Sequence, residues 1–203
     1  MNNGGNVKMP SSLVRVAFET IKDSMGEGSF RLLLKRSNLE RYIGNLPPYD
    51  DSPSITTEEY NGIVRSVFEV FGEKAAKPIL YICGKVGFEH SIKDSPALFG
   101  LAGIGLKLMS DEKKKKAILS KILKKSEEMF ETTYLLDEDE NNLYIKTAGC
   151  IYCEGITSTT PICYTPLGFY EAALKWATGK PEKVVQIQCR AMGHENCTFQ
   201  VSK

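Results

Sequence analysis

Apolar side chains recur at three- and four-residue spacing through most of the first 131 residues, which predicts a series of amphipathic helices. One helix opens with Thr56 or Thr57 ahead of Glu59, a capping pattern, and another opens at Ser110, a suitable cap. The tandem Pro47 and Pro48 end an earlier helix. The predicted helices cover residues 10–28, 31–46, 56–77, 78–92 and 110–131.

The pattern changes near residue 132, where apolar and polar positions begin to alternate. Residues 132–150 predict two strands joined by an acidic turn at 137–142, and a helix follows, with Thr165 as cap, Pro166 at its first position and Gly179 as its stop. A closing hairpin ends the chain. Helices followed by a β-β-α-β-β order predict an α+β fold with an antiparallel sheet.

Alternation in the closing hairpin predicts which side chains face the core. Strand side chains alternate between the two faces of a sheet. If the turn lies near residues 192–194, one inward face carries both hairpin cysteines. The members of that predicted face are Val185, Ile187, Cys189, Cys197, Phe199 and Val201.

The length of 203 residues suits one domain. We expect a disordered tail over 1–9 and a single domain over 10–203. The net charge is +1, and acidic residues flank the run of Lys113 to Lys116, so this run predicts a solvated face and no nucleic-acid partner. No apolar stretch is long enough to span a membrane, and the N-terminus has no signal-peptide core. We therefore expect a cytoplasmic protein.

Catalytic motifs do not emerge from this sequence. His90 and His194 are the only histidines, and neither lies in a recognisable catalytic pattern. The glycines of 100–106 lack the preceding strand and the downstream acid of a dinucleotide loop. The sequence favours a binding protein over an enzyme.

Cysteines are concentrated at the C-terminal end, where five of the six follow residue 149. Cys189 and Cys197 lie on the closing hairpin, and Cys163 precedes a helix whose N-terminus favours a thiolate. Three converging thiolates favour a soft tetrahedral ion, above all zinc. Alternatives are buried filler or a disulfide between the hairpin cysteines, although a cytoplasmic setting disfavours the disulfide. Cys150 and Cys153 form a CxxC that fits a zinc knuckle, a redox pair or a coincidence.

The segment "CYTPLGFYEAALKWATGKPEKVVQIQCRAMGHENCTFQV" resembles the signature of the 4-vinyl-reductase domain family, and the signature region covers about 135–203. It shows a cysteine, a glycine–aromatic helix, a G-K-P strand entry and a hairpin of the form C.A.G...C.F.V. The upstream stretch "GEKAAKPILYICGKVGFE" resembles the first half of the same domain. The resemblance implies a fold shared with transport-particle subunits and haem-nitric-oxide-binding domains.

The resemblance also implies a role and a site. It implies binding of a small hydrophobic molecule, as in sensory modules of phenol-responsive regulators, and a homodimer by analogy of fold. The family's zinc cysteines fall on Cys163, Cys189 and Cys197, and its fourth ligand, a glutamate, falls on Gln186. A neutral carboxamide is a poor zinc donor, so we expect Cys153 as the fourth ligand, with Cys150 second and Gln186 third. Nothing in the chain supports reductase chemistry.

The expected ligand pocket lies between the helical half and the sheet. The expected zinc is structural, because closing three chain segments around one ion leaves no open coordination position. The chain shows no fused ATPase or DNA-binding segment, so we expect any output to pass through a partner or a second copy. The other functions that remain open are a ligand-free assembly subunit and a redox switch built on the CxxC. The predicted pocket residues are Phe88, Phe99, Tyr152, Phe169 and Trp176.

Overall fold

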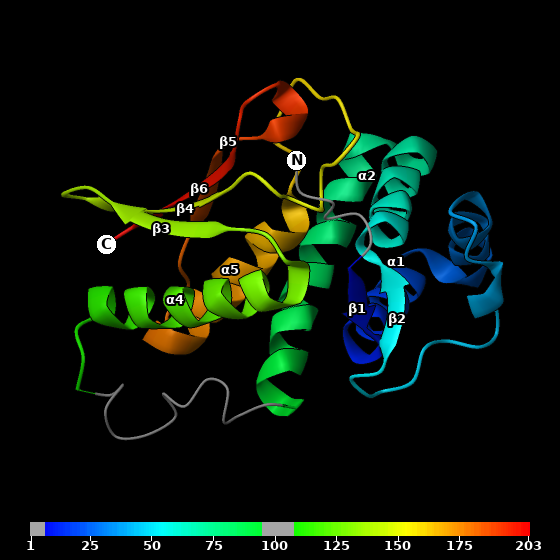
Figure 1. The fold of residues 1–203 in the computed structure, drawn as a ribbon, viewed down its shortest axis with the longest axis horizontal. Helices are drawn as coiled ribbons and strands as arrows, with labels where there is room; N and C mark the ends of the chain where they lie inside the picture. The colour runs from blue at the N-terminus through cyan, green and yellow to red at the C-terminus, as the bar shows by residue number, and fades with distance from the viewer. Residues whose placement is uncertain (1–6, 95–107) are drawn as a thin grey trace.

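The computed structural model describes residues 7–94 and 108–203 of the chain. A helical N-terminal part lies beside a C-terminal part in which helices pack under a sheet (Figure 1). The predicted α+β class is confirmed, and so is the β-β-α-β-β order of the C-terminal part. The elements of the N-terminal part are β1 (Lys8–Pro10), α1 (Ser11–Arg36), the 3-10 helix η2 (Glu40–Tyr42), β2 (Pro53–Thr56) and α2 (Thr57–Asp94). Those of the C-terminal part are α4 (Asp111–Phe130), β3 (Tyr134–Glu138), β4 (Asn142–Thr147), α5 (Tyr164–Thr178), β5 (Val184–Gln188), the 3-10 helix η3 (Arg190–Met192) and β6 (Cys197–Ser202).

The chain enters the fold earlier than the pattern predicts. Lys8–Pro10 forms β1, which pairs antiparallel with β2, and Met9 is buried. The predicted tail of residues 1–9 therefore does not extend to Lys8. The glycine series at 100–106 lies outside the described residues.

Both long N-terminal helices bend at a glycine. Gly26 in α1 has φ 83° and ψ 159°, and Gly72 in α2 has φ 69° and ψ 168°. These angles lie in a region that L side chains rarely adopt, so glycine is required at each bend. Helices predicted as separate pieces thus follow one another directly across a bend. The capping pattern of α2 is present, because the Thr56 hydroxyl accepts from Glu59 N–H while the Glu59 carboxylate accepts from Thr56 N–H.

Helices α2 and α5 approach until their backbones touch at two glycines. A Cβ on Gly84 would lie 1.9 Å from the carbonyl oxygen of Thr165. A Cβ on Gly168 would lie 2.1 Å from the carbonyl oxygen of Tyr81. Only glycine allows this separation, so these two residues fix α5 against α2 and thereby position the N-terminus of α5.

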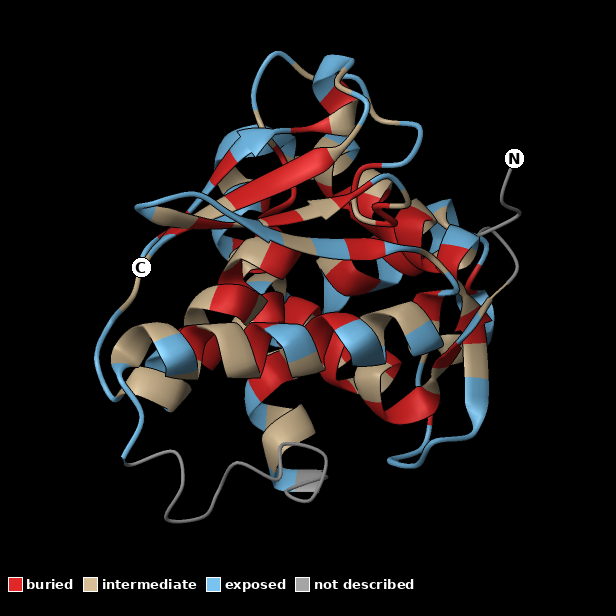
Figure 2. Cartoon of the chain, turned by 60° about the vertical axis from the view of Figure 1, so that its left-hand side comes forward, coloured by how far each residue is buried: buried red, intermediate tan, exposed pale blue. Residues whose placement is uncertain are grey.

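The C-terminal sheet has the strand order β3-β4-β6-β5, antiparallel throughout. Helices α4 and α5 pack against each other under it, and Figure 2 shows buried positions where strands and helices face one another. Leu143, Ile145, Phe199 and Val201 are buried on the inner face. Val185 and Ile187 were predicted to share this face, and that prediction is wrong, because both are 43% exposed.

Helix termini follow the predicted pattern in part. Ser110 caps α4, since its hydroxyl accepts from Lys113 N–H, and Gly179 ends α5 in a left-handed conformation. Thr165 is not the cap of α5, because that helix begins one residue earlier, at Tyr164, with Cys163 at the cap position. The Thr165 hydroxyl is buried and makes no hydrogen bond. Among the described helices, none is both long and apolar enough to cross a membrane.

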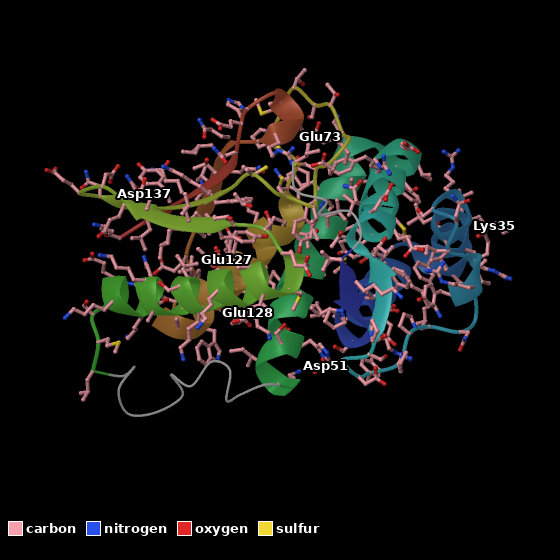
Figure 3. The ribbon with its side chains drawn as sticks, viewed as in Figure 1. Lys35, Asp51, Glu73, Glu127, Glu128 and Asp137 are labelled. Atoms are coloured by element: carbon pink, nitrogen blue, oxygen red, sulfur yellow. The ribbon has the colours of Figure 1, made fainter. Side chains whose placement is uncertain are left out.

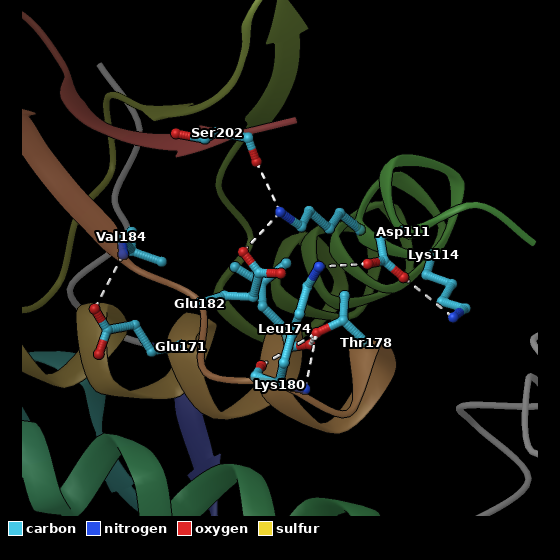
Figure 4. Close-up of polar contacts among 10 residues, drawn as sticks. Asp111, Lys114, Glu171, Leu174, Thr178, Lys180, Glu182, Val184 and Ser202 are labelled. Atoms are coloured by element: carbon cyan, nitrogen blue, oxygen red, sulfur yellow. Dashed lines mark hydrogen bonds and ion pairs between the residues drawn. The ribbon is translucent and has the colours of Figure 1, made fainter.

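The lysine run of α4 is not entirely a solvated face. Lys115 is 3% exposed, and its ammonium contacts Glu182 at 2.7 Å and the carbonyl oxygen of Ser202 at 2.9 Å. Figure 4 shows Glu182 and Ser202 converging beside α4, and the Glu171 carboxylate accepting from Val184 N–H. The prediction for this position failed because the helix turns it under the sheet. The buried charge ties α4 to both edges of the closing hairpin.

Candidate metal centre and adjacent cavity

Five cysteines converge from four chain segments at one end of the sheet. Cys150 and Cys153 lie in the loop after β4, and Cys163 is the residue that precedes α5. Cys189 follows β5, and Cys197 is the first residue of β6. All five are buried, with exposed fractions of 0–2%.

Four of the sulfurs form a compact group. The Sγ atoms of Cys150, Cys153, Cys163 and Cys197 all lie within 4.8 Å of one another and form a candidate metal site. Sγ of Cys150 lies 3.5 Å from Sγ of Cys163, and Sγ of Cys153 lies 3.5 Å from Sγ of Cys197. The fifth sulfur, of Cys189, lies 3.7 Å from Sγ of Cys163. Three of the four predicted ligands are thus in the compact group, the fourth is adjacent to it, and Cys150 joins it.

A β-bulge turns Cys189 toward the other sulfurs. Gln186 pairs with Phe199, but the next pair is Gln188 with Thr198, so Ile187 is an extra residue in β5. The extra residue reverses the alternation: Gln186 faces inward, Gln188 faces outward, and Cys189 is buried again. Cys189 therefore faces the core as predicted, although Val185 and Ile187 do not.

Polar side chains hold the loops that carry the sulfurs. Gln186 accepts from Cys163 N–H at 3.0 Å, so its carboxamide oxygen is engaged with the backbone of the site. Asn61 of α2 donates to the carbonyl oxygen of Ile151 at 2.9 Å, within the CxxC. The Nδ1 atom of His194 lies 3.1 Å from the carbonyl oxygen of Cys189 and thus bridges the turn of the hairpin, where water had been its expected partner.

The close sulfurs alter one another's acidity. Hydrogen bonds from neighbouring thiols, with Cys150 the largest contributor, lower the pKa of Cys197. Hydrogen bonding to Cys153 and Cys163 lowers the pKa of Cys189 to about 6. The same contacts raise the pKa of Cys153 and of Cys163, because thiolates this close repel one another. A cation at the centre would remove that repulsion. Cys83 lies outside the group, and burial raises the pKa of its thiol to about 12.

A cavity of about 670 Å³ adjoins the sulfur group. Its wall combines apolar side chains with polar ones and with two arginines, one of which, Arg190, is paired with Glu154. Cys150 belongs to the wall, and the other four cysteines do not. The lining residues are Thr57, Glu58, Asn61, Arg65, Phe130, Glu131, Thr132, Thr133, Ala148, Gly149, Cys150, Ile151, Glu154, Gly155 and Arg190.

The predicted pocket residues lie in two other places. Phe88, Phe169 and Trp176 form an aromatic cluster between α2 and α5, with ring centroids of Phe88 at 5.4 Å from Phe169 and 6.4 Å from Trp176. Tyr152 packs against Tyr60 of α2 at 6.1 Å, inside the CxxC and next to the sulfurs. Phe99 lies outside the described residues. None of the four described residues lines the 670 Å³ cavity, which sequence reasoning missed because its wall is mostly polar.

Comparison with known proteins agrees with this geometry. Residues 143–203 match the model of the 4-vinyl-reductase domain, a region that contains all five clustered cysteines. Over 59 residues the chain is 36% identical to an uncharacterized protein of Methanocaldococcus jannaschii. This match covers 29% of the chain, and it spans about a third (33%) of the length of that curated relative.

Solved structures share the whole fold at low sequence identity. An Fe(II) unliganded H-NOX protein from K. algicida is similar with a TM-score of 0.64 at 11% identity, covering 96% of each chain. The phenol-responsive sensory domain of the transcription activator PoxR, solved with phenol, is similar with a TM-score of 0.50 at 15% identity, covering 73% of this chain and 74% of that one. The chain thus contains a 4-vinyl-reductase domain and has an H-NOX-like fold.

The described residues fit a cysteine-bound ion and do not fit heme, which H-NOX structures contain. Neither histidine lines the 670 Å³ cavity: His194 bonds the backbone of Cys189, and His90 lines a separate pocket of about 260 Å³. For a tetrahedral ion with sulfur ligands at ~2.3 Å, sulfurs are ~3.8 Å apart. The sulfur separations of 3.5–3.7 Å match that value.

Proposed function

We propose that this protein is a sensor-like domain that binds a small hydrophobic molecule, with a structural zinc ion holding its C-terminal part. The observation that carries the proposal is a shared wall. The loop over residues 148–155 bounds the cavity on one side and contributes Cys150 and Cys153 to the sulfur group on the other. An ion that fixes this loop therefore also fixes the shape of the binding cavity.

Zinc is the ion that the site favours. The cysteine sulfurs are soft ligands, they are buried, and the site offers more thiols than a closed tetrahedral shell requires. A closed shell of four protein ligands is typical of structural zinc, whereas a catalytic ion keeps a position for water. We keep Cys153, Cys163 and Cys197 as ligands, with the fourth position shared as argued below.

The cavity suits a molecule with an apolar body and one polar group. Phe130 and Ile151 offer apolar contact, whereas Asn61, Arg65 and Thr132 offer hydrogen-bond donors at the wall. Phenol has that character, and the similar sensory domain was solved with phenol. The aromatic cluster of Phe88, Phe169 and Trp176 remains the second candidate site.

Phenol binding to two matched variants tests the binding site. Thr133 and Thr159 are both exposed, but only Thr133 lines the cavity. We expect Thr133→Trp to weaken phenol binding at least tenfold, since the indole fills the cavity, and Thr159→Trp to leave it unchanged, both measured by ligand-observed NMR. Equal binding by both variants, with loss in Phe169→Leu, would transfer the site to the aromatic cluster. Absence of binding to the unmodified protein, by phenol and by a panel of small aromatics, would remove the function.

Native mass spectrometry tests the metal and the assembly together. Protein purified without added metal is expected to carry one zinc ion per chain. The same spectrum reports whether the chain is a homodimer, which stays a prediction. A metal-free, folded protein would contradict the zinc.

A further inference from the structure

The sulfur group has one member more than a tetrahedral ion can bind. Cys153, Cys163 and Cys197 are common to two overlapping sets of four. Cys150 completes one set, with its Sγ 3.5 Å from Sγ of Cys163. Cys189 completes the other, with its Sγ 3.7 Å from the same sulfur. Each set places four thiols around one centre.

The two alternative ligands differ in what surrounds them. Cys150 lines the 670 Å³ cavity, so one side of this residue faces the space where a small molecule would enter. Cys189 has an exposed fraction of 0%, lies under the η3 turn, and has His194 bonded to its carbonyl oxygen. A reagent that enters the cavity therefore meets Cys150 before any other cysteine of the group.

Resting on the zinc site proposed above, we infer that Cys150 is an exchangeable ligand and a thiol-modification site of the cavity, and that Cys189 replaces it in the shell. The reagent class is a small disulfide. The Cys150 thiolate attacks one sulfur of the reagent, the S–S bond of the reagent breaks, and a mixed disulfide forms at Cys150. The other half of the reagent leaves as a thiolate and takes a proton from water. The disulfide is the only oxidant that the step needs.

The arrangement keeps the fold intact while the cavity changes. Cys153, Cys163, Cys189 and Cys197 still provide four thiolates, so the loop, the start of α5 and the hairpin remain joined. The group added to Cys150 occupies the cavity and excludes the small molecule. Modification of this one thiol therefore switches binding off without unfolding the domain.

Zinc-loaded protein treated with 2-hydroxyethyl disulfide tests the inference. We expect native mass spectrometry to show one adduct with zinc retained, and peptide mapping to place the adduct on Cys150. In Cys189→Ser the same adduct should expel zinc one for one, because no spare thiol remains. Cys83→Ser is the matched control, since Cys83 is buried outside the group, and it should behave as the unmodified sequence does.

A second variant keeps the test independent of labelling. Cys150→Ser should bind one zinc ion and show four sulfurs at ~2.3 Å by X-ray absorption, with Cys189 as the fourth. Loss of zinc from Cys150→Ser would overturn the inference. So would a first adduct on another cysteine, a Cys150–Cys163 disulfide, or zinc lost from the unmodified sequence in step with labelling. An untreated protein that binds no zinc contradicts the proposed metal site itself, which is a distinct result.

Discussion

Helix α2 makes two very different contacts along its length. Near its C-terminal end it meets α5 backbone to backbone, through Gly84 and Gly168. Near its N-terminal end, Asn61 and Arg65 face a 670 Å³ cavity that separates α2 from the cysteine loop. The first contact leaves no space for even one added carbon, whereas the second leaves space for a small molecule.

The difference indicates how one helix can serve both stability and binding. The glycine contact fixes α5 and with it Cys163, which precedes that helix. The cavity wall depends on a loop without regular secondary structure, so it needs the sulfur group and the Asn61 hydrogen bond to Ile151 to keep its shape. The rigid half of α2 positions the site, and the open half forms it.

Metal removal should produce the largest effect on this comparison. The apparent binding free energy of structural zinc is on the order of 10 kcal/mol in zinc-finger peptides, so its loss should unfold the cysteine loops and the hairpin. We expect a strong chelator to lower the thermal unfolding midpoint sharply, as followed by circular dichroism. Cys83→Ser, treated in the same way, should show the same fall. An unchanged midpoint after verified metal removal would mean that packing alone holds the loops.

A methyl group at the α2–α5 contact should have the next largest effect. Gly84→Ala places a Cβ against the Thr165 carbonyl, so we expect a loss of about 3 kcal/mol in the free energy of unfolding, typical of overpacking. Gly87→Ala is the matched control on the same helix, because its Cβ would meet only the Phe169 ring, at 3.9 Å. That control should be neutral or gain up to ~1 kcal/mol from helix propensity. Urea unfolding of both variants measures the difference, and equal stabilities would refute the close contact.

The smallest expected effect concerns Glu73, which lies on α2 close to the loop leading to Cys163 (Figure 3). Hydrogen bonds from Thr160 and Tyr164 lower the pKa of its carboxyl group. A lowered folded-state pKa gives stability that is present above the unfolded value of about 4.3 and is lost as pH falls through the folded value.

We therefore expect Glu73→Gln to be slightly less stable than the unmodified sequence at pH 7 and equal to it in acid, where both side chains are neutral. Urea unfolding at several pH values measures this. Glu69→Gln, about one turn earlier on α2, serves as control. A difference that persists unchanged into acid would show that the carboxylate charge is not involved.

Local patterns predicted the helices and strands well, because each depends on neighbours in sequence. The Ser110 cap, the acidic turn between β3 and β4, and the stop at Gly179 were all read from short segments. Periodicity failed at Lys115 and at Val185. Burial of Lys115 depends on Glu182, which lies far along the chain, and the bulge near Ile187 breaks the alternation that placed Val185 inside.

For the site, the sequence by itself determined the chemistry: five thiols of the kind that zinc prefers, brought together by a hairpin and by the start of a helix. Only the tertiary structure decided which thiols meet and what lies beside them. Cys150 joins the group and also borders a cavity, because α2 holds the CxxC loop through Asn61. Residue spacing fixes contacts within a turn or a strand, whereas distances between segments follow from how the whole chain packs.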